Sequence, residues 1–358
     1  MTVVDVNSWA ARAIRRLHAE GGGAQTPLRR LPLPAGWHVE VYLKDESAHP
    51  TGTVKHRLVR ALYCHAIASG RIGPETEVVT GTGGPVAVAG AYFARLLGLS
   101  FTAVLPARTP AAVRDGVERY GGRWHTAEQP PAALQREAAQ VAEGLGGHAL
   151  DHFADAAQAV LGCGAPTVAD EIFDQLRGTG HPVPRWIVTG AGTGATSATT
   201  GRHLRRHGYD ARLAVVDPEG SAYFPGWTLG RRDYTTGLPS RIPGIGRPRV
   251  EPAFEPGVVD LVIPVPDAAS PAAVRWLART AGLAAGPATG TVLWGLCHLV
   301  AGLVERGTPG SVVAVAGDGA RPDDTVPAAR SHAPDPYEAA LDRFLSTARS
   351  PVVDGGVG

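Results

Sequence analysis

Short runs rich in β-branched residues alternate with amphipathic stretches along most of this chain, and this alternation constrains its fold more than any other feature. Strands are expected at residues 39–43, 77–79, 100–105, 186–189, 212–217, 261–265 and 311–316. Helices are expected between them, for example at residues 87–97, 132–143 and 272–280. Strands that alternate with helices form parallel sheets with helices packed on their faces. The sequence therefore predicts an α/β protein.

The chain is long enough for two such domains, because a single core rarely grows beyond ~250 residues. Two similar strand, glycine loop and helix units, around residues 80–91 and 189–202, indicate two sheets with a ligand in the cleft between them. Residues 1–45 are predicted to form an N-terminal segment that packs largely on the larger domain, and residues 46–155 a smaller, mobile α/β domain. Residues 156–326 are predicted to form the larger α/β domain with the phosphate loop, and residues 327–358 a C-terminal tail. In the tail we expect a short helix at residues 336–349 and disorder at 350–358.

Lysine is scarce, because only Lys44 and Lys55 are lysines among the 34 residues that are lysine or arginine. A lysine amine can lose its proton and attack a carbonyl, whereas arginine stays protonated. Lys55 follows a predicted turn at residues 50–53 and precedes a helical stretch at 57–63. An amine at a helix N-terminus loses some basicity to the helix dipole. Lys55 is therefore the predicted nucleophile; the alternative is that both lysines survive by chance.

A strand at residues 186–189 leads through a glycine-rich loop into a helix expected at 198–206. Glycines allow successive backbone N–H groups to converge on an anion, and the helix dipole adds positive charge. Thr193 and Thr196 add hydroxyl donors. No Gly-Lys-Ser/Thr follows, so the loop is not a Walker loop. The segment is predicted to bind a phosphate.

Two other interpretations of this loop remain open. Gly190, Gly192 and Ala195 fit the G-x-G-x-x-A dinucleotide fingerprint, and Asp217 ends the next strand where a ribose-binding acid would lie. Against this, the fingerprint usually opens its domain, whereas here a long α/β segment precedes it. The third interpretation is a glycine turn that only packs the helix on the strand.

A phosphate loop together with an activated lysine is what pyridoxal phosphate requires. The lysine forms the internal Schiff base and moves the α-proton, the loop anchors the phosphate, and the ring accepts electrons. Cys64, Cys163 and Cys297 are odd in number and far apart, so neither a disulfide framework nor a metal site is predicted. The net charge of +1 gives no reason to expect nucleic acid or a membrane as partner. Without an apolar run of ~18 residues or a signal peptide, we expect a cytoplasmic protein with a small-molecule ligand.

Several motifs then resemble one family, the fold type II pyridoxal phosphate enzymes of the cysteine synthase and cystathionine β-synthase group. His49-Pro-Thr-Gly-Thr-Val-Lys-His-Arg57 resembles its Schiff-base motif and Gly192-Thr-Gly-Ala-Thr196 its phosphate loop. Thr26-Pro-Leu28 resembles its N-terminal motif and Gly244-Ile-Gly246 its substrate-side turn. The resemblance runs from about residue 8 to residue 326. It extends to the bacterial L-cysteine desulfhydrase branch at residues 42–47, 216–219, 244–252, 265–270 and 286–291.

The resemblance implies two parallel-sheet α/β domains of the tryptophan synthase β-like type. It also implies that the protein forms a homodimer and catalyses a lyase reaction. The implied reaction is β-elimination on a cysteine-like or other β-substituted amino acid through an aminoacrylate. Lys55 would be catalytic. The implied cofactor ligands are Lys55, Gly192, Thr193, Gly194, Ala195, Thr196, Thr289 and Pro85, and the implied substrate ligands are Thr82, Gly83, Gly84, Gly244, Ile245 and Gly246.

Other functions remain open. They are a β-replacement synthase for a specialised amino acid in secondary metabolism, an impaired pyridoxal phosphate binding protein, and an NAD-dependent oxidoreductase. His49 and His56 flank the lysine and are alternative general bases, although the family lysine moves its own proton. Cys297 and His298 lie in an apolar stretch and are expected in the core.

In relatives a Ser or Thr hydroxyl meets the ring nitrogen, and the matching position falls at Ala288 or Thr289. Ala288 has no hydroxyl, so Thr289 is the candidate. A neutral partner leaves the nitrogen unprotonated, which favours β-elimination over transamination.

The chain departs from the family pattern at residues 82–86, where relatives bind the substrate carboxylate. Pro85 has no N–H and Val86 replaces a hydroxyl. Each lost hydrogen bond to a carboxylate is worth about 1.5–3 kcal/mol. Weak turnover of free cysteine, or a different substrate, is therefore expected. A second departure lies at residues 316–322, near the ring in relatives.

Overall fold

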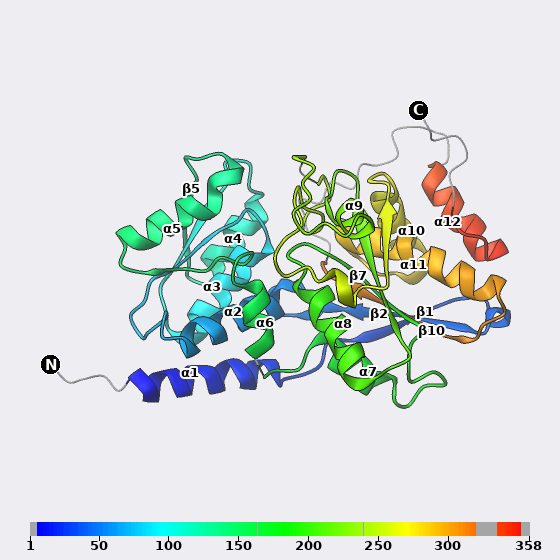
Figure 1. Ribbon diagram of the computed structural model, residues 1–358, viewed down its shortest axis with the longest axis horizontal. Helices are drawn as coiled ribbons and strands as arrows, with labels where there is room; N and C mark the ends of the chain where they lie inside the picture. Colours follow the sequence, from blue (N-terminus) through cyan, green and yellow to red (C-terminus); the bar gives the residue numbers. More distant parts are fainter. Residues whose placement is uncertain (1–5, 163, 239, 320–334, 352–358) are drawn as a thin grey trace. The chain divides into compact units, whose positions relative to one another are not determined.

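A computed structural model describes the chain except for residues 1–5, 163, 239, 320–334 and 352–358 (Figure 1). It divides into two compact units. Unit 1 consists of Met1–Gln25 and His49–Pro166, and unit 2 consists of Thr26–Ala48 and Thr167–Gly358. The N-terminal segment that was predicted to pack on the larger domain is thus divided between the units at Gln25. Cys163 and most of the predicted disordered tail lie outside the described residues.

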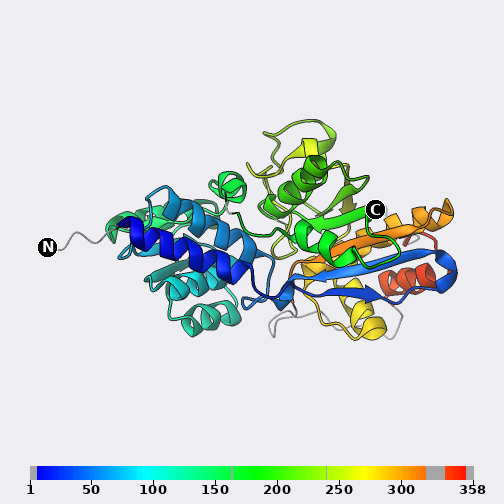
Figure 2. The same ribbon diagram turned by 90° about the horizontal axis from the view of Figure 1, so that it is seen from below.

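Unit 1 is built on a parallel four-stranded sheet with the order β5-β4-β3-β6. Its strands are β3 (Val78–Gly81), β4 (Phe101–Leu105), β5 (Arg123–Thr126) and β6 (His148–Ala149). Its helices are α1 (Val6–Gly21), α2 (Lys55–Ala68), α3 (Pro85–Leu97), α4 (Ala111–Arg119), the 3-10 helix η3 (Pro131–Ala133), α5 (Leu134–Gly144) and α6 (Ala156–Gly162). Helix α1 packs against α2 and α3, and Figure 2 shows it in dark blue beside them.

Unit 2 is built on a six-stranded sheet with the order β1-β2-β10-β7-β8-β9, in which only the edge pair β1–β2 is antiparallel. Its strands are β1 (Leu28–Leu31), β2 (Val39–Asp45), β7 (Trp186–Gly190), β8 (Arg212–Pro218), β9 (Leu261–Val265) and β10 (Gly310–Ala316). Its helices are α7 (Val168–Leu176), α8 (Ala195–His207), α9 (Tyr223–Thr228), α10 (Ala269–Ala281), α11 (Pro287–Glu305) and α12 (Pro336–Thr347). Short 3-10 helices are η1 (Ala35–Trp37), η2 (Glu46–Ala48) and η4 (Pro256–Val258).

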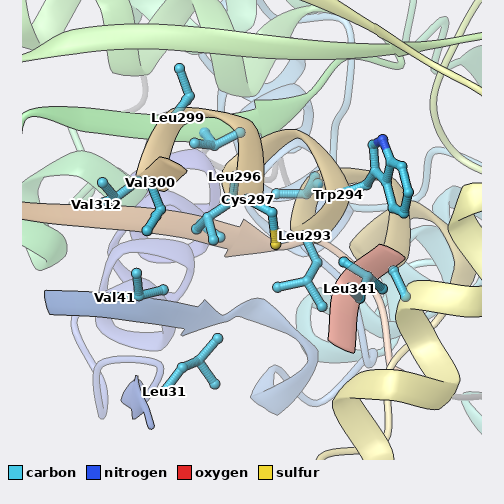
Figure 3. Close-up of a cluster of buried hydrophobic side chains, with 14 of the residues drawn as sticks. Leu31, Val41, Leu293, Trp294, Leu296, Cys297, Leu299, Val300, Val312 and Leu341 are labelled. Atoms are coloured by element: carbon cyan, nitrogen blue, oxygen red, sulfur yellow. The ribbon is translucent and has the colours of Figure 1, made fainter. Parts of the chain in front are cut away.

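The sheet of unit 2 has an apolar core on each face, because successive strand residues point to opposite faces. One core joins α10, α11 and α12 to the sheet through side chains such as Val41, Leu293, Val312 and Leu341 (Figure 3). The other joins α7 and α8 to the opposite face. Within the described residues, α11 is the one helix long and apolar enough to cross a membrane, and most of it is buried in the first core. Cys297 lies there as predicted, and burial raises the pKa of its thiol.

The predicted α/β fold with two parallel sheets is confirmed, and all seven predicted strands are present. In unit 2, strands β7, β8 and β10 end at one edge of the sheet, where each is followed by a loop. In unit 1, β3 and β4 end at one edge of the sheet in the same way. Ligands bind at such carboxyl edges in parallel sheets.

Candidate cofactor and substrate site

Lys55 is the first residue of α2, as its sequence context predicted. The preceding turn is closed by Gly52 N–H, which donates to His49 O at 2.8 Å, and Gly52 adopts a left-handed φ of 71°. The Lys55 N–H donates to Thr53 Oγ1 at 3.3 Å. The amine therefore lies at the positive end of the α2 dipole, which favours its uncharged form. Its side chain is half-buried.

Lys44 is fully buried in unit 2 and has a different environment. Its ammonium donates to Thr26 O and Glu171 Oε2, each at 2.6 Å, and to Gln175 Oε1 at 2.9 Å. An ammonium has three protons, and all three have acceptors here. Thr26, from the N-terminal motif, also donates from its hydroxyl to Glu46 Oε1 at 2.6 Å. Lys44 is thus a structural cation in a buried polar network.

His56 follows Lys55 but is buried beneath α1. Its Nε2 lies 2.6 Å from Glu20 Oε1, its Nδ1 lies 3.1 Å from Thr51 Oγ1, and its ring stacks on His49. Burial lowers the pKa of His56, against the opposing effect of the Glu20 carboxylate. Both ring nitrogens have partners within unit 1, so His56 holds α2 against α1, and neither nitrogen is left to accept a substrate proton.

The candidate carboxylate loop connects β3 to α3. The Thr82 N–H donates to Val104 O at 3.0 Å, and its hydroxyl accepts from Gly84 N–H at 3.2 Å. Gly84 is the N-cap and Pro85 opens the helix. Proline is well suited to this position, but it removes one amide from a turn that would otherwise face an anion. Val86 is buried. The geometry fits the predicted loss of donors.

His152 was not singled out in the sequence, and it follows β6, which pairs with the strand that leads into this loop. Strand β6 pairs with β3 so that Val79 lies opposite Ala149, and Thr80 Oγ1 donates to Leu150 O at 3.0 Å. The side chain of His152 is buried. The sequence does not mark β6 as a strand, because it has only two residues, so the position of His152 after β6 becomes clear only from the pairing of β3 with β6.

The predicted phosphate loop joins β7 to α8, and Gly194 is the N-cap with a left-handed φ of 88°. The buried Thr193 hydroxyl accepts from Ala195 N–H at 3.3 Å, and the Tyr223 hydroxyl donates to Gly192 O. The first-turn amides of a helix have no intrahelical acceptors, so this N-terminus can bind an anion.

Glycine is required at position 194 because the backbone of residues 253–254 packs against it. A Cβ there would lie 2.5 Å from Phe254 Cα and 2.8 Å from Ala253 C. The sequence pattern predicts that glycines in this loop let backbone N–H groups converge on an anion. The backbone of residues 253–254 is a sufficient reason.

The predicted substrate-side turn lies against the phosphate loop. The Gly246 N–H donates to Ala191 O at 2.8 Å, and a Cβ on Gly190 would lie 2.7 Å from Ile245 Cγ2. Gly244 and Gly246 both have positive φ, which glycine tolerates without strain. Ile245 in turn clusters with Ala288 at the start of α11. The structure therefore brings three predicted segments of unit 2 together.

Thr289 is fully buried, and its hydroxyl donates to Asp318 Oδ1 at 2.7 Å. Its N–H donates to the same oxygen at 3.0 Å, and the Ala288 N–H donates to Asp318 Oδ2 at 3.3 Å. The predicted role of Thr289 toward the ring nitrogen stays a prediction. Asp318 belongs to the second departure, of which residues 320–322 lie outside the described part.

Asp217 ends β8 but does not suit ribose binding. It is only 2% exposed, and its Oδ2 accepts from Phe224 N–H at 2.7 Å. Burial raises the pKa of Asp217 to about 6, against the opposing hydrogen bonds from Ser221 and Phe224. The carboxylate is buried and accepts a hydrogen bond from the backbone at the start of α9.

Comparison with known proteins identifies relatives along most of the chain. The family model described as "Pyridoxal-phosphate dependent enzyme" matches residues 19–318. L-cysteine desulfhydrase Cds1 of Mycobacterium tuberculosis is 49% identical over 316 residues, which cover 87% of this chain and 86% of that protein. N-(2-amino-2-carboxyethyl)-L-glutamate synthase of Ralstonia nicotianae is 28% identical over 294 residues, which cover 77% of this chain and 80% of that protein.

Solved structures share the fold. O-ureido-L-serine synthase superposes with a TM-score of 0.72 at 24% identity, covering 94% of this chain and 98% of that one. A hydrogen sulfide-producing enzyme from Fusobacterium nucleatum superposes with a TM-score of 0.69 at 17% identity, covering 86% of this chain and 97% of that one.

Proposed function

This chain belongs to the family of pyridoxal-phosphate dependent enzymes, and we propose that it eliminates the β-substituent of a cysteine-like amino acid. The predicted resemblance to the cysteine synthase group, the fold and the cofactor are confirmed. The observation that carries the reaction type is the likeness to an L-cysteine desulfhydrase along most of both chains. The family and the burial of Asp217 argue against the oxidoreductase alternative.

The residues of the chain fit the cofactor. The amides at the start of α8 and the hydroxyls of Thr193 and Thr196 would hold the phosphate, because a helix N-terminus favours an anion. Lys55 is the amine that would bind the cofactor's aldehyde, since the three protons of Lys44 are occupied. When bound, the cofactor's ring supplies an acceptor for the electron pair released from the substrate Cα.

Lys55 also has the place of the general base. Lys55 is the first residue of α2, and its amine can reach a substrate bound beside the start of that helix. We propose that Lys55 Nζ takes the Cα proton of the substrate. The Thr82 hydroxyl and the backbone amide of Gly83 would hold the substrate carboxylate, while the Gly84 N–H orients the Thr82 hydroxyl by donating to it. Residues 244–246 would face the substrate's side chain.

With L-cysteine, the balanced elimination consumes one water and gives pyruvate, ammonia and sulfide. A second candidate is β-replacement, in which a nucleophile takes the place of the leaving group. The Ralstonia relative named as a synthase favours it, as does the altered loop at residues 82–86. An impaired protein that binds the cofactor without turnover is the third. The homodimer, the cytoplasmic location and a role in secondary metabolism stay predictions.

One experiment tests the assignment of the lysine. Borohydride reduction of the cofactor-loaded protein followed by peptide mass mapping should place the pyridoxyl group on Lys55. The matched control is Lys55→Ala, which should retain its fold and lose the label. A label on Lys44, or on no lysine of cofactor-loaded protein, would overturn the proposal.

A second experiment separates the candidate reactions. The protein is incubated with L-cysteine or O-acetyl-L-serine, with and without sulfide or L-glutamate as nucleophile. Pyruvate and ammonia in equal amounts support elimination, whereas a new amino acid formed only with the nucleophile supports replacement. A labelled Lys55 with neither product supports the impaired protein.

A further inference from the structure

The ring of His56 connects helix α1 to the turn that precedes Lys55. Its Nε2 lies 2.6 Å from Glu20 Oε1, at the end of α1, and its Nδ1 lies 3.1 Å from Thr51 Oγ1, in the turn. The side chain of His56 is fully buried. Because Lys55 and His56 are the first two residues of α2, a ring that is held on both sides also holds the start of this helix.

The groups beside Nε2 determine where the ring carries its proton. Burial opposes the ionisation of Glu20, but the hydrogen bond from His56 and the charge of Arg60 outweigh burial and lower the pKa of this carboxyl. An ionised carboxylate only accepts hydrogen bonds, so the hydrogen between Glu20 and His56 belongs to Nε2. Burial lowers the pKa of His56, against the opposing effect of Glu20. The ring is therefore neutral near pH 7, and its single N–H is at Nε2.

The aromatic rings around His56 keep it in this orientation. His49 stacks on it with ring centres 4.5 Å apart, and Phe93 lies against it with ring centres 4.6 Å apart. Tyr92 contacts the same ring and donates from its hydroxyl to Glu20 Oε1 at 3.4 Å. A ring packed in this way does not readily exchange the places of its two nitrogens, so Nδ1 stays directed at the turn.

The lone pair on Nδ1 gives the turn a side-chain link to α2. The Thr51 hydroxyl can donate as well as accept, and Nδ1 has no proton, so Thr51 donates to His56. The Gly52 N–H donates to His49 O at 2.8 Å and closes the turn, but neither residue belongs to α2. The hydrogen bond from Thr51 to His56 crosses from the turn to the helix, and it limits the conformations in which Lys55 can follow the turn.

We propose that His56 is a positioning residue that fixes the place of the Lys55 amine. Glu20 keeps the ring proton on Nε2, so that Nδ1 accepts from Thr51 and holds the turn before the lysine. This inference rests on the proposed function, in which Lys55 captures the cofactor. It also gives α1 a role, because Glu20 lies at its end while most of the helix precedes residue 19, where the match to the family model begins.

The proton on the ring is measured by ¹⁵N NMR of the cofactor-free protein with labelled histidine side chains. The His56 signals are identified by their loss in His56→Gln. In the wild type, Nε2 should be protonated and Nδ1 unprotonated near neutral pH. Glu20→Ala removes the acceptor for Nε2–H, so a fraction of the rings should carry the proton on Nδ1 and donate to Thr51. A protonated Nδ1 in the wild type, or a tautomer that is unchanged in Glu20→Ala, would overturn the proposal.

The place of the lysine is measured by the rate at which it captures pyridoxal phosphate. Cofactor-free protein is mixed with pyridoxal phosphate, borohydride is added after increasing times, and peptide mass mapping follows the label on Lys55. Thr51→Val should slow the labelling roughly fivefold, the factor that one neutral hydrogen bond contributes. Thr51→Ser keeps the hydroxyl and should label at the wild-type rate. His56→Gln keeps a donor for Glu20 but has no Nδ1, so it should be slowed like Thr51→Val.

Tyr92→Phe is the matched control, because it removes a contact to Glu20 and keeps the ring packing and the Thr51 hydroxyl. It should label at the wild-type rate. Equal rates in wild type and Thr51→Val, or a Tyr92→Phe protein slowed as much as Thr51→Val, would contradict the role of His56. If His56→Gln fails to fold, the rates of Thr51→Val and Thr51→Ser still decide it. A wild-type protein without label on Lys55 contradicts the proposed function itself, so the two proposals fail in different ways.

Discussion

Lys44 and Glu171 form a buried ion pair in which Lys44 Nζ lies 2.6 Å from Glu171 Oε2, and both side chains are at most 5% exposed. The pair links β2 to α7 within unit 2. It explains why a chain that uses arginine almost everywhere keeps a lysine at this position. A compact ammonium can point three protons at three close acceptors, whereas a planar guanidinium cannot. The two lysines are thus kept for different reasons, and chance survival is not needed for Lys44.

Lys44→Met should destabilise the protein strongly, because it leaves Glu171 buried without its cation. Removal of one partner of a buried pair costs about 3–5 kcal/mol. Urea unfolding of the cofactor-free protein measures the change. The double variant Lys44→Met/Glu171→Leu should recover most of the loss. A change below about 1 kcal/mol in the single variant, within the range of exposed pairs, would show that the network adds little to stability.

Gly194→Ala should lower the stability of the cofactor-free protein. A non-glycine residue with left-handed φ costs about 1–2 kcal/mol, and the new Cβ would collide with residues 253–254. Thermal unfolding of the apo form gives the answer, with Gly208→Ala as control, since that glycine also has positive φ but open space around it. If both substitutions lower the stability of the apo form equally, backbone strain alone explains the loss, and the collision with residues 253–254 contributes nothing.

Thr196→Val should weaken cofactor binding and leave apo stability nearly unchanged. Thr196 lies in the first turn of α8 and is only partly buried. Loss of one hydrogen bond to a charged phosphate, at about 1.5–3 kcal/mol, corresponds to roughly a tenfold or greater rise in Kd. A fluorescence titration with pyridoxal phosphate measures it. Unchanged affinity would place the phosphate away from this hydroxyl.

Pro85→Ser combined with Val86→Thr should strengthen the binding of L-cysteine, because it restores an amide and two hydroxyls at the start of α3. Adding Gly83→Ser is not expected to help, because a Cβ there would lie 3.0 Å from Thr109 Oγ1 and 3.2 Å from Pro106 Cδ. We expect a fall in KM of roughly tenfold, less than two full charged hydrogen bonds because the geometry is imperfect.

Cysteine-dependent sulfide release by the two proteins provides the measurement. Pro110→Ser is the control, since Pro110 is the N-cap of α4 in the same unit. If wild type already turns over cysteine as efficiently as the double variant, the carboxylate is held elsewhere, and His152 becomes the first residue to replace.

Asp217 should make stability depend on pH between about 4 and 6. Its pKa is raised from 3.8 to about 6 by burial, so the folded state keeps a proton that the unfolded chain has lost. The contribution of Asp217 to stability is therefore largest below pH 4 and falls as pH rises through 6, by about 3 kcal/mol in total. Asp217→Asn removes the titration and keeps an oxygen for Phe224 N–H. Its Tm should exceed that of wild type at pH 7.5 and approach it at pH 4; a pH-independent difference would contradict this.

The sequence by itself determined the fold class, the long strands and the residues whose chemistry is local. Strands β7, β8 and β10 are covered on both faces, so they are apolar runs that stand out between helices. β5, with the sequence Arg-Trp-His-Thr, and the two-residue β6 carry no such signal and were missed. Lys55 was predicted as the nucleophile because a turn, a lysine and a helix follow one another in the chain, and its role stays a prediction.

Only the tertiary structure decided which distant residues act together. The partners of Lys44 are Thr26, Glu171 and Gln175, and nothing in the local sequence around Lys44 points to the last two. In the same way, Asp318 Oδ1 accepts a hydrogen bond from the Thr289 hydroxyl, and the backbone of residues 253–254 requires glycine at 194. The physical reason is that local backbone preferences act over a few residues and define helices and strands. Hydrogen bonds and close packing depend on atoms that meet only after the sheet has formed, so their partners cannot be read from neighbouring residues.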